Sequence, residues 1–310
     1  MEIHHPSASV PQHLIGGIVA VSDFNGFDLN HQAIVKRLVG WAHAEGRPAI
    51  VATFDPPAIH PDQRCSLSDR LTTPLQRASL LATAGVDAMI VFSFKEVFDE
   101  RFVADRLSSY LQVNGIVVGD QPICSLRMTS EGPGFIAGHS SNKIVVEKIE
   151  PMMVDGVRVS TSSIYHCLRT GDLRGAAKML SQPFTIEGIV QHGKKLGRTI
   201  GYPTANVDMG NYFRPAYGVY AVIACLANGQ ILHGVANLGI RPTFNPPKEL
   251  LEPHFFDFKG DLYGQAIRIA LIDYLRPEAR FSSTELLIKQ VEIDCIEARN
   301  ILLASSSNHL

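Results

Sequence analysis

The residues best suited to chemistry lie in one glycine-rich, basic stretch, residues 188–206, which reads G-I-V-Q-H-G-K-K-L-G-R-T-I-G-Y-P-T-A-N. Glycine lets the backbone come close to a ligand, and backbone N–H groups beside cationic side chains form a binding place for phosphate. A basic surface hairpin would have a similar composition, but the Pro-Thr-Ala-Asn that follows favours a functional loop. The phosphate-binding residues that this stretch predicts are Gly193, Lys194, Lys195, Gly197, Arg198 and Gly201.

Two neutral oxygen donors follow the basic loop. Thr204 and Asn206 stand two residues apart after Pro203, so in an extended segment their side chains face the same side. Mg²⁺ is a hard cation that takes oxygen ligands and keeps phosphates as partners. We therefore predict that Thr204 and Asn206 hold one Mg²⁺ beside the phosphate-binding loop.

The whole stretch resembles the signature of riboflavin kinase, specifically the C-terminal module of bacterial bifunctional riboflavin kinase/FMN adenylyltransferases, also called FAD synthetases. The resemblance runs from Pro183 to the C-terminus and continues in G-V-Y-A-V, G-V-A-N-L-G-I-R-P-T-F, L-E-P-H-F-F-D-F, D-L-Y-G and L-R-P-E-A-R-F. It implies a kinase that phosphorylates the riboflavin 5′-hydroxyl to give FMN, with ATP as co-substrate and Mg²⁺ as cofactor.

A carboxylate is the expected acceptor for the proton of the attacked alcohol. Glu252 is the candidate, since it stands where the family reads Glu-x-His-x-x-Asp-Phe, here E-P-H-F-F-D-F. The resemblance implies that Glu252 activates the riboflavin 5′-hydroxyl. Without the motif, a glutamate that precedes an apolar strand is more often a solvated edge residue.

The N-terminal half resembles the nucleotidyltransferase module of the same family in order and length, but it departs from the pattern where chemistry would occur. The family's G-x-F-D-G-x-H-x-G-H is S-D-F-N-G-F-D-L-N-H at residues 22–31, which keeps His31 and has Asp28 in place of the first histidine. An aspartate there would repel charge on the attacked α-phosphate. The other positions that depart from the family's histidine and arginine motifs are Pro57, Ser163 and Tyr165.

These departures favour a folded but inactive adenylyltransferase module, because removing even one oxyanion donor costs on the order of 10²–10³ in rate. We therefore predict an enzyme that makes FMN only. Two alternatives remain open. One is a fully bifunctional enzyme that makes FAD through a rearranged site, and the other is a non-catalytic flavin- or nucleotide-binding regulator.

The pattern of apolar runs predicts two domains. Alternating strands and helices over residues 14–180 predict an α/β, doubly wound, Rossmann-like nucleotidyltransferase domain, with ligands at the carboxyl ends of its strands. From residue 183 onward, short strands with Gly and Pro between them, including one at 254–258, predict a small β-barrel closed by a helix at 282–303. We expect residues 1–13 to form a loose tail and the boundary to lie near 181–183.

Composition limits the function classes. The net charge of −2 does not favour nucleic acid as a partner, and the apolar run at 14–21 is too short to span a bilayer. The five cysteines form no C-x-x-C pair, which argues against a zinc site or disulfide framework and favours a reducing, cytoplasmic location. The expected partners are the small molecules riboflavin and ATP, and the sequence leaves the oligomeric state open.

Overall fold

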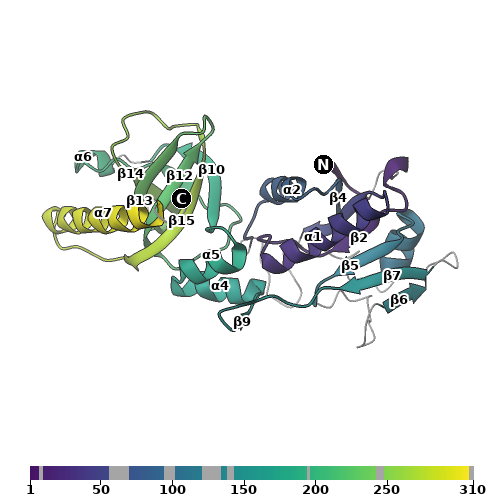
Figure 1. The fold of residues 1–310 in the computed structure, drawn as a ribbon. Helices are drawn as coiled ribbons and strands as arrows, with labels where there is room; N and C mark the ends of the chain where they lie inside the picture. Colours follow the sequence, from purple (N-terminus) through teal and green to yellow (C-terminus); the bar gives the residue numbers. More distant parts are fainter. Residues whose placement is uncertain are drawn as a thin grey trace. The chain divides into compact units, whose positions relative to one another are not determined.

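The computed structural model describes residues 1–6, 10–55, 70–93, 102–120, 134–137, 143–193, 196–241 and 248–306. The chain forms two compact units, residues 1–161 and 162–310. Figure 1 shows a sheet covered by helices in the first unit and a barrel crossed by a long helix in the second. The doubly wound α/β domain and the barrel with a closing helix, both predicted from the sequence, are confirmed.

The first unit is built on a seven-stranded sheet with the order β1-β4-β3-β2-β5-β7-β6. All neighbouring pairs are parallel except β6 with β7. The strands are β1 (Glu2–His4), β2 (Ile18–Val21), β3 (Ala49–Asp55), β4 (Ala88–Ser93), β5 (Gly115–Val118), β6 (Gly134–Ala137) and β7 (Lys143–Lys148). The helical segments are η1 (Gln12–Leu14), α1 (Leu29–Ala44), α2 (Pro74–Thr83) and the π-helical η2 (Phe102–Tyr110), and a hairpin of β8 (Met153–Val154) and β9 (Val157–Arg158) follows the sheet.

The central strands of this sheet are apolar on both faces because helical segments cover both. Every residue of β2 is buried, and successive side chains enter two separate clusters. Val19 and Val21 pack with Leu107 and Leu111, whereas Ile18 packs with residues of α1 and α2. This arrangement explains why the strand has no alternation of polar and apolar residues.

The expectation of a loose tail at residues 1–13 is wrong at residues 2–4, which form a strand. Residues 2–4 form β1, which pairs in parallel with β4 through Glu2 opposite Ala88. The Glu2 carboxylate also accepts from His4 at 2.8 Å. The edge of β4 offers backbone groups to any extended segment, so a polar segment without an apolar pattern pairs there.

The second unit consists of two short helices, a closed barrel and a long helix. The barrel order is β10-β11-β14-β13-β12-β15, and α7 packs across it through Ala298 and Leu302. The helices are α4 (Thr161–Thr170), α5 (Leu173–Leu180), α6 (Leu196–Thr199) and α7 (Thr284–Ser306). The strands are β10 (Thr185–Gln191), β11 (Asn206–Asp208), β12 (Gly218–Leu226), β13 (Ile231–Arg241), β14 (Lys248–Phe255) and β15 (Ala266–Pro277).

The strand expected at 254–258 is largely misplaced, because β14 begins at Lys248 and ends at Phe255. Its first residues, Lys-Glu-Leu-Leu, lack the alternation that marks a strand, and pairing with β13 holds them in place from Arg241 opposite Lys248 onward. Barrel closure supplies backbone partners on both sides, and this stabilises a strand that its own pattern does not indicate.

Both α4 and α5 lie with the barrel rather than with the sheet. The Tyr165 ring stacks on Phe213 with centroids 4.2 Å apart, and the Leu168 carbonyl accepts from Ala216 at 3.0 Å. The compact units therefore divide at residues 161 and 162, ahead of the predicted boundary at 181–183. As a boundary between functional modules, 181–183 stays a prediction.

Candidate active sites

A cavity of about 350 Å³ opens in the barrel where β10 gives way to the glycine-rich loop. Its walls combine apolar residues of β14 with the polar side chains of the loop, which suits a ligand with one flat apolar part and one charged part. The rings of His192 and Tyr263 stack at 3.9 Å on one side of it. The other lining residues are Val190, Arg198, Pro203, Thr204, Ala205, Pro253, Phe255, Phe258, Gly260, Asp261 and Leu262.

The structure brings part of the predicted phosphate site together at this cavity. Arg198 and Thr204 line it, and Gly201 lies in the turn after α6. At Gly197 only a hydrogen fits, because a Cβ there would lie 2.2 Å from the carbonyl oxygen of Tyr202. Lys194 and Lys195 lie outside the described residues.

The second proposed metal ligand, Asn206, is buried at the start of β11 and does not line the cavity. Its amide lies directly against the backbone of Gly193, where a Cβ would be 2.5 Å from Nδ2. Gly193 therefore leaves the space that the Asn206 side chain fills. An amide oxygen and a hydroxyl held this close to a phosphate loop are a donor set that fits Mg²⁺.

Glu252 lies on β14 opposite Asn237 of β13. Alternate side chains of a strand point to opposite faces, so Glu252 faces away from the cavity that Pro253 and Phe255 line. Its backbone is nevertheless close to the loop, because the Ala205 N–H donates to the Pro253 carbonyl at 2.9 Å. Glu252 and the cavity thus lie on opposite faces of β14.

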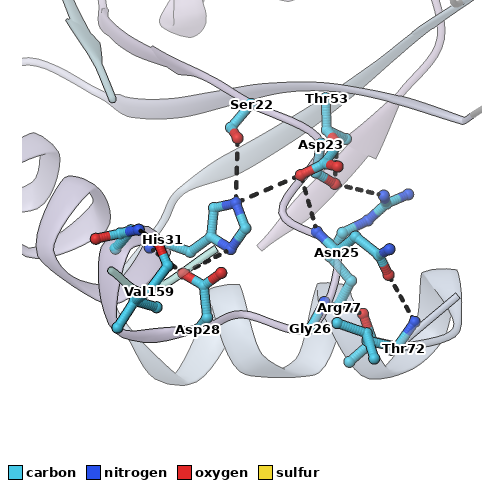
Figure 2. Close-up of polar contacts among 12 residues, drawn as sticks. Ser22, Asp23, Asn25, Gly26, Asp28, His31, Thr53, Thr72, Arg77 and Val159 are labelled. Atoms are coloured by element: carbon cyan, nitrogen blue, oxygen red, sulfur yellow. Dashed lines mark hydrogen bonds and ion pairs between the residues drawn. The ribbon is translucent and has the colours of Figure 1, made fainter. Parts of the chain in front are cut away.

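A second polar pocket lies in the first unit, beyond the carboxyl ends of β2, β5 and β7. Its lining includes His31 of α1 and residues of the turn after β2, Ser22 and Asp23. Figure 2 shows the imidazole between the two carboxylates of Asp23 and Asp28. A position at the carboxyl ends of parallel strands is where ligands bind in doubly wound folds, as the sequence predicted.

His31 is 6% exposed, and its imidazole contacts three side chains. Its Nε2 lies 3.2 Å from the Ser22 hydroxyl and 3.4 Å from Asp23 Oδ1. Its Nδ1 lies 3.3 Å from Asp28 Oδ1, but that oxygen already accepts the His31 backbone N–H at 3.0 Å. Nδ1 has no well-directed hydrogen bond, so Asp28 acts on it through electrostatic attraction.

The two carboxylates decide the charge of this histidine. Burial lowers the pKa of His31, but the Asp28 charge and the hydrogen bond to Asp23 outweigh burial, and the pKa is raised overall. Burial has the opposite effect on Asp23 and raises its pKa, but the hydrogen bond and the charge of His31 bring that pKa below its usual value. The two carboxylates therefore stabilise the protonated imidazole relative to its neutral form.

Asp28 has a structural role that the sequence comparison did not indicate. It is the N-cap of α1, and its carboxylate accepts the backbone N–H of the third residue after it. Asp is among the best N-caps, so the helix start itself is stabilised by the residue that replaces the family's histidine. Asn30 adds a second tie, since it donates to Val159 and accepts from Met152, both at 2.7 Å.

Several polar residues of this pocket were not identified from the sequence. Asp23 contacts His31, and the buried Arg77 donates to the Asp23 carbonyl at 2.8 Å. Asp120, also in the pocket lining, forms ion pairs with Lys148 and Arg158, and these hydrogen bonds lower the pKa of its carboxyl. The sequence feature that could have identified them is the polar residues that end successive parallel strands, because these ends meet at one edge of the sheet.

The remaining departures from the family pattern lie elsewhere. Tyr165 and Ser163 belong to α4 in the second unit, where the Tyr165 ring packs on Phe213 beside Arg169. Pro57 lies outside the described residues. Among the residues that the structure describes, no group of three His, Cys, Asp or Glu side chains is placed to hold a metal ion, and none of the helices there is both long and apolar enough to cross a membrane.

Comparison with protein families matches both halves of the chain. A model described as riboflavin kinase matches residues 180–302, and one described as FAD synthetase matches residues 10–163. A crystal structure of a protein described as a macrolide-efflux protein from Streptococcus pneumoniae has a TM-score of 0.79 over 95% of this chain and 97% of its own. Its identity is 23%, so this likeness shows the fold alone.

Curated relatives match nearly end to end. Proteins named bifunctional riboflavin kinase/FMN adenylyltransferase are 33% identical in Haemophilus influenzae, over 92% of this chain and 94% of theirs, and 32% identical in Bacillus subtilis, over 96% of each. The Escherichia coli K12 protein of the same name is 31% identical over 95% of each chain. These matches do not support the interpretation of the first unit as an inactive remnant, since they favour the bifunctional alternative. With both family models in place and matches of this length, the chain belongs to the family of bifunctional riboflavin kinase/FMN adenylyltransferases.

Proposed function

We propose that this chain makes FMN from riboflavin and ATP in its barrel and converts FMN to FAD with a second ATP in its first unit. The observation that carries the proposal is a polar pocket in each unit, each inside a region that matches the corresponding family model. The names of the relatives support the pairing of the two reactions.

In the barrel, ATP occupies the cavity with its phosphates toward Arg198 and Thr204. Arg198 supplies positive charge, and Gly197 lets the loop fold tightly against the Tyr202 carbonyl, which brings backbone N–H groups of the loop together beside Thr204. Thr204 and Asn206 would hold Mg²⁺, which neutralises phosphate charge when it is bound. The stacked rings of His192 and Tyr263 form a wall for the flat base.

Riboflavin approaches from the other face of β14, where Glu252 lies. The Glu252 carboxylate accepts the proton of the 5′-hydroxyl as that oxygen attacks the γ-phosphorus and ADP leaves. The phosphoryl group passes at the edge where β14 meets the Thr204 segment, which the hydrogen bond from Ala205 to Pro253 holds together.

In the first unit, an FMN phosphate oxygen attacks the α-phosphorus of ATP, and pyrophosphate leaves. His31 lines this pocket, and its protonated imidazole is held between the Asp23 and Asp28 carboxylates. Arg158 also lines the pocket, and both it and Lys148 pair with Asp120. Electrostatic stabilisation of the α-phosphate oxygens by these cations is the contribution that this pocket can make.

A kinase-only enzyme is the second candidate, and one observation favours it. Asp28 is fixed in the pocket at 2% exposure, where its charge would repel an incoming triphosphate. If this repulsion prevails, the first unit makes no FAD.

The test incubates the full chain with Mg-ATP and either riboflavin or FMN, and resolves riboflavin, FMN and FAD by chromatography. FAD from both flavins supports the bifunctional proposal. FMN from riboflavin with no FAD from either supports the kinase-only enzyme. Absence of both products overturns both candidates and favours a non-catalytic flavin- or nucleotide-binding protein.

A further inference from the structure

Helix α7 is apolar on two opposite sides. One side packs on the barrel, where Ala298 and Leu302 join Val219 and Val235 in a buried cluster. The other side carries four large apolar side chains that are between 48% and 68% exposed, namely Leu286, Ile293, Ile296 and Leu303. Figure 1 shows α7 as one continuous helix along the outside of the barrel. A row of exposed apolar residues on one helix is typical of an interaction surface.

The spacing of the exposed row is that of a coiled-coil seam. Leu286, Ile293, Ile296 and Leu303 are separated by seven, three and seven residues, and Lys289 and Asn300 fill the intervening positions. The six residues therefore alternate in steps of three and four, which keeps them on one face of a helix that pairs with another. A helix that only covers the barrel needs no such second seam.

The same row is symmetric about its midpoint between residues 294 and 295. In an antiparallel pair of two α7 helices, Leu286 stands opposite Leu303 of the second copy, and Ile293 stands opposite Ile296. Lys289 likewise stands opposite Asn300, whose amide oxygen can accept from the ammonium group. An isologous twofold interface requires this self-complementarity.

The charges beside the seam are also complementary. Glu292 and Arg299 occupy equivalent flanking positions of successive heptads, which approach each other across an antiparallel pair. Both are exposed, and Arg299 is positioned by its contacts with Asp257 at 3.0 Å and with the Phe256 ring at 4.2 Å. Two-fold symmetry would form this pair of opposite charges twice.

We propose that α7 is a dimerisation surface that pairs antiparallel with α7 of a second copy of this chain. The helix has 23 residues, and the seam from Leu286 to Leu303 is ~27 Å long at about 1.5 Å per residue. One helix on each side lies at the low end of interface sizes, so the dimer is reversible, with a dissociation constant on the order of micromolar. The polar Lys289–Asn300 layers set the register at some cost in affinity.

The first test is sedimentation velocity of the full chain from about 1 to about 200 μM, a range that spans weak interfaces. We expect a shift from monomer to dimer with concentration, and Ile293→Asp to remain monomeric throughout. The matched control is Ile231→Asp, because Ile231 is 55% exposed in the same unit but lies on β13, and it should dimerise as the parent does. A parent chain that stays monomeric, or an Ile293→Asp variant that dimerises as well as its control, would overturn the proposal.

Cross-linking tests the orientation with less disturbance to the fold. Under mild oxidation, a mixture of the Leu286→Cys and Leu303→Cys chains should form a disulfide-linked dimer, above the background that the native cysteines give. Leu286→Cys alone should not, because its equivalents lie far apart in the antiparallel pair. Efficient linking of Leu286→Cys to itself, or no mixed dimer, would contradict the antiparallel dimer.

Discussion

The barrel cavity and the pocket at the sheet edge are both suited to phosphates, but they provide positive charge in different ways. The barrel cavity is lined by the Arg198 guanidinium, beside a loop whose glycines, Gly193 and Gly197, let its own segments pack closely. The sheet pocket relies on His31, whose charge depends on Asp23 and Asp28. Backbone N–H groups keep their polarity at every pH, whereas an imidazolium depends on its neighbours. The difference predicts that the two reactions respond differently to substitution and to pH.

The largest expected effect is on the barrel alone. Glu252→Gln keeps the shape of the side chain but cannot accept a proton, so kcat for FMN formation should fall about 10²–10⁴-fold with little change in KM. FAD formation from supplied FMN should be unchanged. The matched control is Glu187→Gln, which breaks a surface ion pair with Arg268 in the same barrel. A variant that keeps kcat and raises only KM would make Glu252 a binding residue.

A substitution in the sheet pocket should affect FAD formation alone. His31→Gln removes the positive charge between the two carboxylates, so FAD formation from FMN should fall by on the order of 10²–10³-fold, as for the loss of one charged transition-state donor. FMN formation should be unchanged. The control is His43→Gln, an exposed histidine on the same helix. Equal FAD rates in the two variants would remove His31 from the chemistry.

Much of the fold follows from the sequence, because apolar runs and Gly-Pro punctuation predicted β2, β3, β5 and the strand before the glycine-rich loop, β10. Among the missed elements are β1, β11 and the start of β14, short segments held by backbone pairing to a neighbour. In the barrel, Arg198 and Thr204 line one cavity, while Glu252 faces the other side of its strand, and the roles assigned to these residues stay predictions.

The histidine–carboxylate arrangement could not be predicted, and the reason is the backbone of the turn that carries it. Phe24 and Phe27 both adopt positive φ, at 49° and 50°, a conformation that bulky residues rarely take. Two such residues bend the chain so that Asp23 and Asp28 meet on the His31 ring. A sequence pattern that assigns this stretch to a loop does not define the positions of the Asp23 and Asp28 carboxylates.

A smaller effect is expected from the position of the cut between modules. A fragment of residues 162–310 retains α4 and α5, whose buried Leu168, Leu173 and Leu180 pack within the second unit. A fragment of residues 183–310 loses them, and at about 1.5–3 kcal/mol for each large side chain it should be less stable by at least about 3 kcal/mol. Urea unfolding followed by circular dichroism measures the difference. Equal stability of the two fragments would support the boundary at 181–183.

The smallest expected effect concerns the pH dependence of the first unit. Because the pKa of His31 is raised in the folded state, its stabilising contribution is fully present below the unfolded pKa of about 6.5 and is lost as pH rises through the folded pKa. Asp28→Asn keeps the N-cap, since Asn and Asp cap equally well, but it removes the charge that raises this pKa. The variant should therefore be less stable than the parent at low pH and converge with it at high pH.

The single tryptophan of the chain, Trp41, lies on α1 in the first unit, so its fluorescence reports the unfolding of that unit alone. Urea titrations near pH 6 and pH 9 would give the two free-energy differences. Near pH 9 the parent and Asp28→Asn should agree within ~0.5 kcal/mol, because the caps are equivalent and His31 is closer to neutral in both. A difference that is the same at both pH values would mean that Asp28 acts on α1 only as a cap and does not set the charge of His31. The sheet pocket would then be as insensitive to pH as the barrel.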